Sequence, residues 1–123
     1  MIFLSVLEDE QLKQKFFTQN NIPINENSCC VTAKEKDDIL GYCLFDIDKE
    51  KIIIRHIVPQ NDLGLADGIL RSTLHVAAER FVMNAYYENE EMFSFFNALK
   101  FIKNVEEKSL NMDKLFTSCQ NCK

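Results

Sequence analysis

The fold is decided by the stretch Asn61-Asp62-Leu63-Gly64-Leu65-Ala66-Asp67-Gly68-Ile69-Leu70, which contains two of the chain's three glycines. It follows the apolar run Ile52 to Val58, which predicts a strand, and it opens the apolar-periodic segment Leu65 to Arg80, which predicts a helix. A strand, a glycine-containing turn and a helix N-terminus present unpaired backbone N–H groups and a positive dipole end to a phosphate. The Rossmann and P-loop patterns are both absent, so we expect an anion-binding turn of another type.

Length and charge limit the classes of function. A chain of 123 residues suffices for one domain, which we place at residues 1–117 with a short tail at 118–123. The formal net charge is -5 and basic residues do not cluster, which argues against a nucleic-acid partner. The apolar start MIFLSVL lacks the basic region and cleavage site of a signal peptide, and no apolar run approaches the length of a membrane span. We therefore expect a cytoplasmic protein without a membrane partner.

Hydrophobic patterning predicts a mixed α+β chain. Expected strands cover residues 1–7, 29–34, 39–45, 51–58, 82–86, 101–105 and 110–116. Expected helices cover residues 8–20, 64–80 and 89–99, the last with Asn89 as its N-cap. The strands at 29–34, 39–45 and 51–58 are joined by short polar turns, which predicts an antiparallel meander. The helix at 64–80 then serves as a crossover that places the next strand parallel to the last strand of the meander.

A second motif begins at Asn89 and reads Asn89-Glu90-Glu91-Met92-Phe93-Ser94-Phe95-Phe96-Asn97-Ala98-Leu99-Lys100-Phe101. It resembles the segment Asn-x-x-Ala-x-x-x-Tyr-x-x-x-Gly-Phe of the GNAT acyltransferase superfamily, with Phe96 at the Tyr. The first stretch resembles the pyrophosphate loop of that superfamily, Gln/Arg-x-x-Gly-x-Gly/Ala, and here reads Asn61-x-x-Gly64-x-Ala66. The two motifs and the element order cover roughly the last two-thirds of the chain. They imply an α+β fold with a GNAT-like mixed, mostly antiparallel sheet flanked by helices.

The resemblance implies an N-acetyltransferase that moves an acetyl group from acetyl-CoA, its cosubstrate, to a primary amine on a small molecule or a protein. A thioester is already activated, so such a protein mainly positions the amine and stabilises the oxyanion, here through a backbone N–H of the strand at 51–58. The contacts implied for the cofactor come from the end of that strand, the turn and the second motif. They are Ile57, Val58, Asn61, Leu63, Gly64, Leu65, Ala66, Asn89 and Phe96.

A general base must deprotonate the ammonium of the acceptor. Strict alternation along the strand would place His56 on the same face as Ile52, Ile54 and Val58. An imidazole with a pKa near neutrality can serve as this base, and the alternative is a half-buried structural histidine. Glu88 and Glu90, just past the strand at 82–86, are further candidates, and the alternative interpretation for both is a solvated acidic loop.

The general acid of many GNAT enzymes is a tyrosine, and this chain has Phe96 at that position. Tyr86 is a candidate replacement, because alternation directs either Tyr86 or Tyr87 toward the core and the other away from it. The alternative for both is packing, with the hydroxyl at the rim of the core.

Departures from the GNAT pattern keep a second function open. Asn61 stands where the superfamily has Gln or Arg, and Asp67 puts a carboxylate in the first turn of the helix, where it opposes a bound pyrophosphate. The link between the first helix and Cys29 is too short for a second N-terminal helix, which often helps to wall the acceptor site. The alternative is a catalytically inactive GNAT-like domain that binds CoA or a partner protein. A monomer and a homodimer are both open.

The five cysteines are odd in number and do not indicate a disulfide framework. Cys119-Gln120-Asn121-Cys122 forms a CxxC in the tail, and a zinc site would need two more ligands. Cys29 and Cys30 are adjacent in a strand and face opposite ways, so both can hardly reach one zinc, and we expect no metal site. We expect an exposed dithiol, with a redox or metal-binding role as a third hypothesis.

Overall fold

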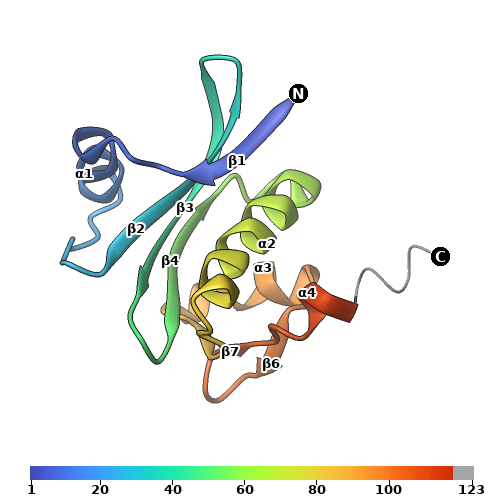
Figure 1. The fold of residues 1–123 in the computed structure, drawn as a ribbon. Helices are drawn as coiled ribbons and strands as arrows, with labels where there is room; N and C mark the ends of the chain where they lie inside the picture. The colour runs from blue at the N-terminus through green and yellow to red at the C-terminus, as the bar shows by residue number, and fades with distance from the viewer. Residues whose placement is uncertain (118–123) are drawn as a thin grey trace.

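A seven-stranded sheet forms the centre of the computed structural model, which describes residues 1–117 (Figure 1). The strand order is β1-β2-β3-β4-β5-β7-β6, and only β4 and β5 are parallel neighbours. The strands are β1 (Ile2–Val6), β2 (Ser28–Glu35), β3 (Asp38–Ile47), β4 (Ile52–Val58), β5 (Ala85–Tyr87), β6 (Ile102–Asn104) and β7 (Ser109–Leu110). The helices are α1 (Glu10–Gln19), α2 (Leu63–Glu79), α3 (Phe93–Ala98) and α4 (Lys114–Thr117), with a 3-10 turn η1 (Glu90–Met92) before α3. The predicted fold class, meander and parallel crossover are confirmed.

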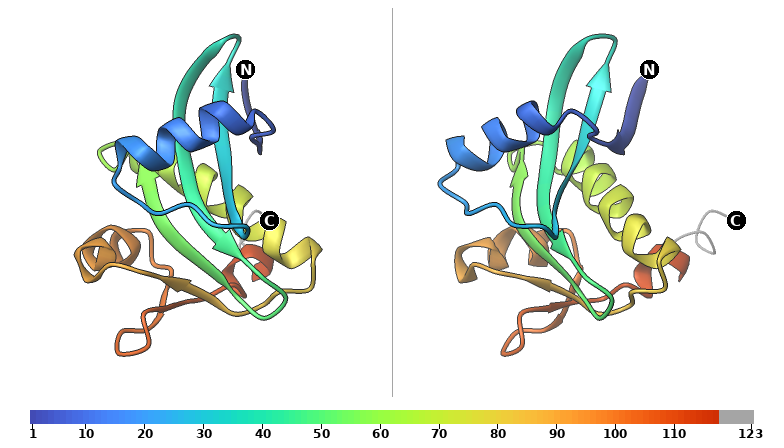
Figure 2. Two further views of the ribbon diagram at one scale, coloured as in Figure 1. Left: turned by 90° about the vertical axis from the view of Figure 1, so that its left-hand side faces the viewer. Right: turned by 60° about the vertical axis from the view of Figure 1, so that its left-hand side comes forward.

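Helices α1 and α2 pack on opposite faces of the sheet (Figure 2). The buried stripe of α2, which includes Ile69, Leu70 and Leu74, belongs to the larger apolar cluster. We call this side of the sheet the α2 face. On the other side, the α1 face, Phe16 and Phe17 of α1 pack in the smaller cluster. The sheet is therefore covered on both sides near its centre, as the periodic apolar positions of both helices predict.

Three predicted elements differ from the structure near the C-terminus. The predicted strand at 110–116 is wrong, because the side chain of Asn111 accepts a hydrogen bond from the N–H of Asp113 at 3.0 Å and turns the chain into α4. The strand expected at 82–86 is only the short β5, since the N–H of Val82 still bonds to Ala77 O at the end of α2, at 2.9 Å. The helix expected from Asn89 begins as η1 and becomes α-helical at Phe93.

The two adjacent cysteines of β2 face opposite sides of the sheet, as predicted. Cys29 packs against the cluster of the α2 face, and Cys30 is buried in the cluster of the α1 face. Within residues 1–117 no group of His, Cys, Asp and Glu side chains has an arrangement that could hold a metal ion. The predicted CxxC at Cys119 and Cys122 lies outside the described residues. No helix of the described part is long and apolar enough to cross a membrane.

Candidate active site

A bulge in β4 sets the orientation of the candidate base. Leu44 of β3 lies opposite His56, and the next residue, Phe45, lies opposite Ile54, so Arg55 is the extra residue. Ile54 is buried in the α2 face, whereas Leu44, the partner of His56, is buried in the α1 face. Directly paired residues share a face, so His56 lies on the α1 face. The prediction that His56 shares a face with Ile52 and Ile54 is wrong, because the bulge breaks the alternation.

The same displacement moves Val58 away from the face expected for it. Val58 pairs with Tyr42, which packs in the cluster of the α1 face. Val58 therefore lies on the side of His56, and the expectation that it shares a face with Ile52 and Ile54 is also wrong. Ile57, between His56 and Val58, is fully buried on the α2 face.

Strands β4 and β5 part in the middle of the sheet. They pair from Ile52 with Ala85 to Ile54 with Tyr87, and the N–H of Glu88 donates the last bond, to Ile54 O at 3.0 Å. Beyond that point β4 continues to Val58, whereas the chain after β5 turns into η1. The backbone of β4 after Ile54 thus has no β5 neighbour within the described residues. We call this divergence of β4 and β5 the strand gap.

The backbone of Ile57 faces the strand gap. The N–H of Ile47 bonds to Asn27 O, so the backbone of Cys43, four residues earlier in β3, also faces β2, and its partner Ile57 makes no ladder bond to β3. The carbonyl of Ile57 accepts a hydrogen bond from Gln60 Nε2 at 3.3 Å. The N–H and C=O of one strand residue point the same way, so the N–H of Ile57 also faces away from β3. A backbone N–H fixed in a strand is the kind of donor that stabilises an oxyanion without reorganisation.

Close packing between β3 and the end of β4 depends on Gly41. A Cβ atom at Gly41 would lie 2.3 Å from Val58 O and 2.9 Å from Ile69 Cδ1. Backbone oxygens do not tolerate such an approach, so only glycine allows β3, β4 and α2 to meet here. Gly41 therefore allows the end of β4 and the first half of α2 to pack directly against β3.

The N-terminus of α2 is capped by the chain's own carboxylate. Asp62 Oδ1 accepts a hydrogen bond from the N–H of Leu65 at 3.1 Å, and Asp62 O accepts one from Ala66 at 2.9 Å. The first-turn N–H groups of Leu63 and Gly64 have no acceptor inside the helix. A Cβ on Gly64 would meet nothing closer than Asp62 Oδ1 at 3.7 Å. The turn and the helix start that the sequence predicts are formed, and Asp62 accepts from two of the four N–H groups of Leu63 to Ala66, through its side chain and its carbonyl.

The turn borders a hollow of about 390 Å³, which lies between the start of α2 and β1. It is lined by Ile2, Leu4, Asp62, Gly64, Leu65 and Gly68. Asn61, predicted to bind the cofactor, is exposed beside the turn. Asp67, which the sequence indicates as an obstacle to a pyrophosphate, pairs with Arg71 at 2.8 Å, which partly offsets its charge.

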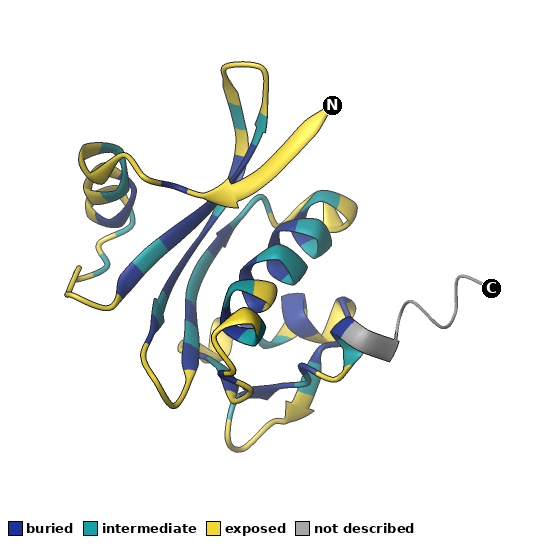
Figure 3. Ribbon diagram, viewed as in Figure 1, coloured by how far each residue is buried: buried dark blue, intermediate teal, exposed yellow. Residues whose placement is uncertain are grey.

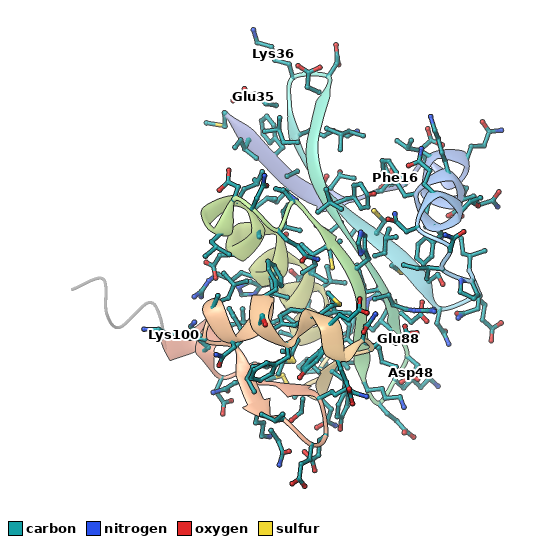
Figure 4. All side chains as sticks on the ribbon, turned by 180° about the vertical axis from the view of Figure 1, so that it is seen from behind. Phe16, Glu35, Lys36, Asp48, Glu88 and Lys100 are labelled. Atoms are coloured by element: carbon teal, nitrogen blue, oxygen red, sulfur yellow. The ribbon has the colours of Figure 1, made fainter. Side chains whose placement is uncertain are left out.

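The histidine and the glutamates proposed as bases have different environments. His56 is half-buried, and burial lowers its pKa from the ordinary 6.5, so the imidazole is neutral at pH 7. Glu88 lies beside β4 (Figure 4), and its carboxylate is in an ion pair with Arg55. The side chain of Glu88 is 52% exposed. His56 thus combines partial burial with a neutral ring, whereas the carboxylate of Glu88 is already paired with Arg55 and the side chain of Glu90 is 86% exposed.

Arg55 is a residue of the site that the sequence analysis missed. Its guanidinium pairs with Asp46 at 2.9 Å and with Glu88, and it donates to Pro23 O at 3.2 Å. It therefore ties the link before β2, strand β3 and the end of β5 together. An arginine in the middle of an apolar strand is the signal that would have indicated it.

The aromatic residues behind the strand gap are mostly core. Tyr87 is 2% exposed and packs on Phe96, with ring centroids 5.1 Å apart, and Phe96 is fully buried. Burial, with a contribution from the charge of Glu90, raises the pKa of Tyr87. Tyr86 is half-buried and pairs with Ile53, on the opposite face from Tyr87. The predicted alternation is confirmed, and Tyr86 is the tyrosine of β5 that faces away from the core.

The second motif begins as predicted. Asn89 Oδ1 accepts a hydrogen bond from the N–H of Glu91 at 2.9 Å, which confirms Asn89 as an N-cap. Its side chain is therefore engaged in starting η1, directly after the point at which β4 and β5 part.

Neither a protein-family model nor a curated protein sequence matches the chain. Solved structures do match it. A ribosomal-protein-alanine N-acetyltransferase from Brucella melitensis biovar Abortus 2308 superposes with a TM-score of 0.60 at 12% identity, over 80% of this chain and 90% of that one. A GNAT family acetyltransferase from Elizabethkingia anophelis with acetyl-CoA bound gives 0.56 at 15% identity, over 81% and 74%.

A third structure covers nearly all of both chains. It is the Y144F mutant of the AtaT toxin bound to the C-terminus of the antitoxin AtaR, with a TM-score of 0.60 at 12% identity over 97% of each chain. At identities this low, structural similarity shows the fold alone, and the chemistry must be argued from the residues of the site. The two sequence motifs and these structures agree: this chain has the fold of the GNAT acetyltransferases.

Proposed function

We propose that this protein is an N-acetyltransferase that transfers the acetyl group of acetyl-CoA to a primary amine. The observation that carries the proposal is the strand gap, where the N–H of Ile57 points away from β3, one residue from His56. One open backbone donor and one neutral imidazole are the two groups that aminolysis of a thioester most needs.

At the acyl end, the thioester would enter between β4 and β5 with its carbonyl oxygen on the N–H of Ile57. The amine nitrogen attacks the carbonyl carbon, and the bond between that carbon and the CoA sulfur breaks. The proton lost by the amine goes to His56, which lies on the α1 face and so faces an acceptor that arrives from that side. Tyr86 is turned away from the core but pairs with Ile53, four residues before Ile57, so the thiolate would take up its proton from solvent.

At the phosphate end, the N–H groups of Leu63 and Gly64 would bind the pyrophosphate, with Leu65 and Ala66 completing the turn. The carboxylate of Asp62 already accepts a hydrogen bond from the N–H of Leu65, so it competes with the pyrophosphate for this donor. We infer that its side chain turns away when the cofactor binds. The gap and the turn lie at the C-terminal end of β4 and at the N-terminus of the helix that follows it, so one extended ligand can reach both.

The experiment that tests the proposal is release of CoA thiol from acetyl-CoA in the presence of a panel of primary amines, from polyamines to lysine and N-terminal peptides. We expect turnover with at least one amine, lost in His56→Gln and kept in His75→Gln, whose histidine is exposed on α2. Acetyl-CoA binding without thiol release across the panel would contradict an enzyme and identify a CoA-binding module.

A further inference from the structure

The two edges of the sheet differ in how they are protected. The edge strand β6 has three residues and carries the charged Lys103, both of which discourage pairing with another chain. The other edge strand, β1, has five residues, IFLSV, without a charge, a proline or a bulge. All five are exposed, with Phe3 at 62% (Figure 3). Native proteins rarely leave an apolar edge of this kind uncovered.

The backbone of β1 offers free hydrogen-bonding groups in a defined pattern. The N–H of Leu7 bonds to Cys30 O at 2.8 Å, so the odd-numbered residues of this segment face β2. The N–H and C=O groups of Ile2, Leu4 and Val6 therefore point outward from the sheet. Such a row of alternating donors and acceptors is a template for pairing with another extended strand.

We propose that β1 pairs with β1 of a second copy of this chain, antiparallel and about a two-fold axis at Leu4. In this register Leu4 lies opposite Leu4 of the second copy, and Ile2 lies opposite Val6. All three outward-facing residues then exchange backbone bonds with the second copy. A shift of the axis to Phe3 or Ser5 would leave one end of the strand unpaired.

The side chains of the α1 face fit this register. It places Phe3 opposite Ser5 of the second copy. The small Ser5 borders a hollow of about 340 Å³, also lined by Thr32, Lys34 and Asp9. The large side chain of Phe3 in one copy thus faces the hollow beside Ser5 of the other copy. The two-fold axis produces this contact twice. A strand from an unrelated protein would have no reason to match this pattern.

The side chains of the α2 face fit it as well. Ile2, Leu4 and Val6 would form one apolar row with their counterparts. This row borders the hollow between β1 and α2, where Gly68 leaves room and a Cβ would lie 3.7 Å from Leu4 Cδ1. Pairing would cover the side chains of β1, which are exposed in the single chain.

The charges at the two ends of β1 favour an antiparallel over a parallel pair. Glu8 and Asp9 follow the C-terminal end of the strand, whereas the hairpin beside its N-terminal end carries both signs, Lys34 and Lys36 together with Glu35, Asp37 and Asp38. Lys36 stands at the tip of that hairpin (Figure 4). An antiparallel pair sets the acidic end of each copy beside the mixed-charge hairpin of the other, whereas a parallel pair would bring the two acidic ends together.

The first test is the mass in solution, by sedimentation velocity at micromolar concentrations. We expect twice 14.3 kDa for the natural chain. Leu4→Pro removes an outward N–H that the ladder to β2 does not use, and should give a monomer. The matched variant Leu4→Val keeps that N–H and should stay dimeric. A natural chain that is monomeric, or a Leu4→Pro variant as dimeric as Leu4→Val, would overturn the proposal.

A second test reads the register without disrupting the strand. In a Cys119→Ser/Cys122→Ser background, Leu4→Cys puts two thiols directly across the axis, within the range of a disulfide. Mild oxidation should give a covalent dimer. The control Val6→Cys should not cross-link, because its two copies would lie about 13 Å apart along the strands. Equal cross-linking of the two variants, or none with Leu4→Cys, would exclude this pairing.

Discussion

The strand gap and the N-terminus of α2 are two ends of one candidate site, and they are built from different kinds of groups. The gap depends on the backbone: a bulge at Arg55, a short β5 and the freed N–H of Ile57. The N-terminus of α2 also offers backbone N–H groups, but the side chain of Asp62 already accepts from one of them. Backbone geometry tolerates sequence change, whereas a single side chain can weaken an anion site. We therefore expect catalysis to depend on the gap and cofactor affinity to be limited at the helix.

We expect the largest effect on activity from a change to the proposed base at the strand gap. His56→Gln removes the proposed base and should lower kcat/KM for the amine by roughly 10²–10⁴, the usual contribution of such a group. Binding of acetyl-CoA should not change, since His56 lies at the acyl end. Steady-state kinetics together with a binding titration measure both. A variant that loses cofactor affinity and keeps its rate would place His56 at the wrong end of the site.

We expect the next largest effect, on the stability of the fold, from a change at Gly41 beside the strand gap. Gly41→Ala forces a Cβ to within 2.3 Å of Val58 O, and should lower the free energy of unfolding by about 2 kcal/mol or more. Its matched control is Gly68→Ala, in the interior of α2, where a Cβ makes only ordinary contact. There we expect stabilisation of about 0.5–1 kcal/mol. Urea denaturation compares the two, and equal values would mean that the close packing at Gly41 does not matter.

The pH dependence sharpens the assignment of the base. Burial lowers the pKa of His56 below 6.5, so the neutral base is present at pH 7 and activity should fall up to tenfold per pH unit below that lowered pKa. The unfolded chain binds this proton more readily, so the stability contributed by the neutral His56 is present above pH 6.5 and is lost as the pH falls from there. The acid limb should vanish in His56→Gln. A limb that persists unchanged would assign it to another group.

We expect the smallest effect from a change at the N-terminus of α2, where Asp62 is proposed to limit the affinity for acetyl-CoA. Asp62→Asn keeps an N-cap and removes a negative charge beside the proposed pyrophosphate, so acetyl-CoA affinity should rise by about 1 kcal/mol, roughly fivefold. The control Asp67→Asn removes a charge that Arg71 already offsets, and should change affinity less. Calorimetry at low salt measures both, and a loss of affinity in Asp62→Asn would contradict competition by this carboxylate.

The order of the elements and the turn at Gly64 could be predicted because both depend on local patterns. The cap at Asn89 is equally local, and its side chain accepts the expected hydrogen bond. The face of His56 could not be predicted, because the extra residue in β4 is set by pairing with β3, and alternation alone does not reveal it. The roles of Arg55 and Asp62 were missed for a similar reason, since their contacts join segments or appear only once the helix start is fixed.

The most direct measurement is a calorimetric titration of acetyl-CoA into the natural chain and into Gly64→Glu. The position has room for a side chain, so the variant should fold and differ mainly by a carboxylate placed at the proposed pyrophosphate site. We expect one acetyl-CoA to bind per chain with micromolar affinity, and binding to be lost in Gly64→Glu. No binding to the folded natural chain, or equal binding to both proteins, would contradict it.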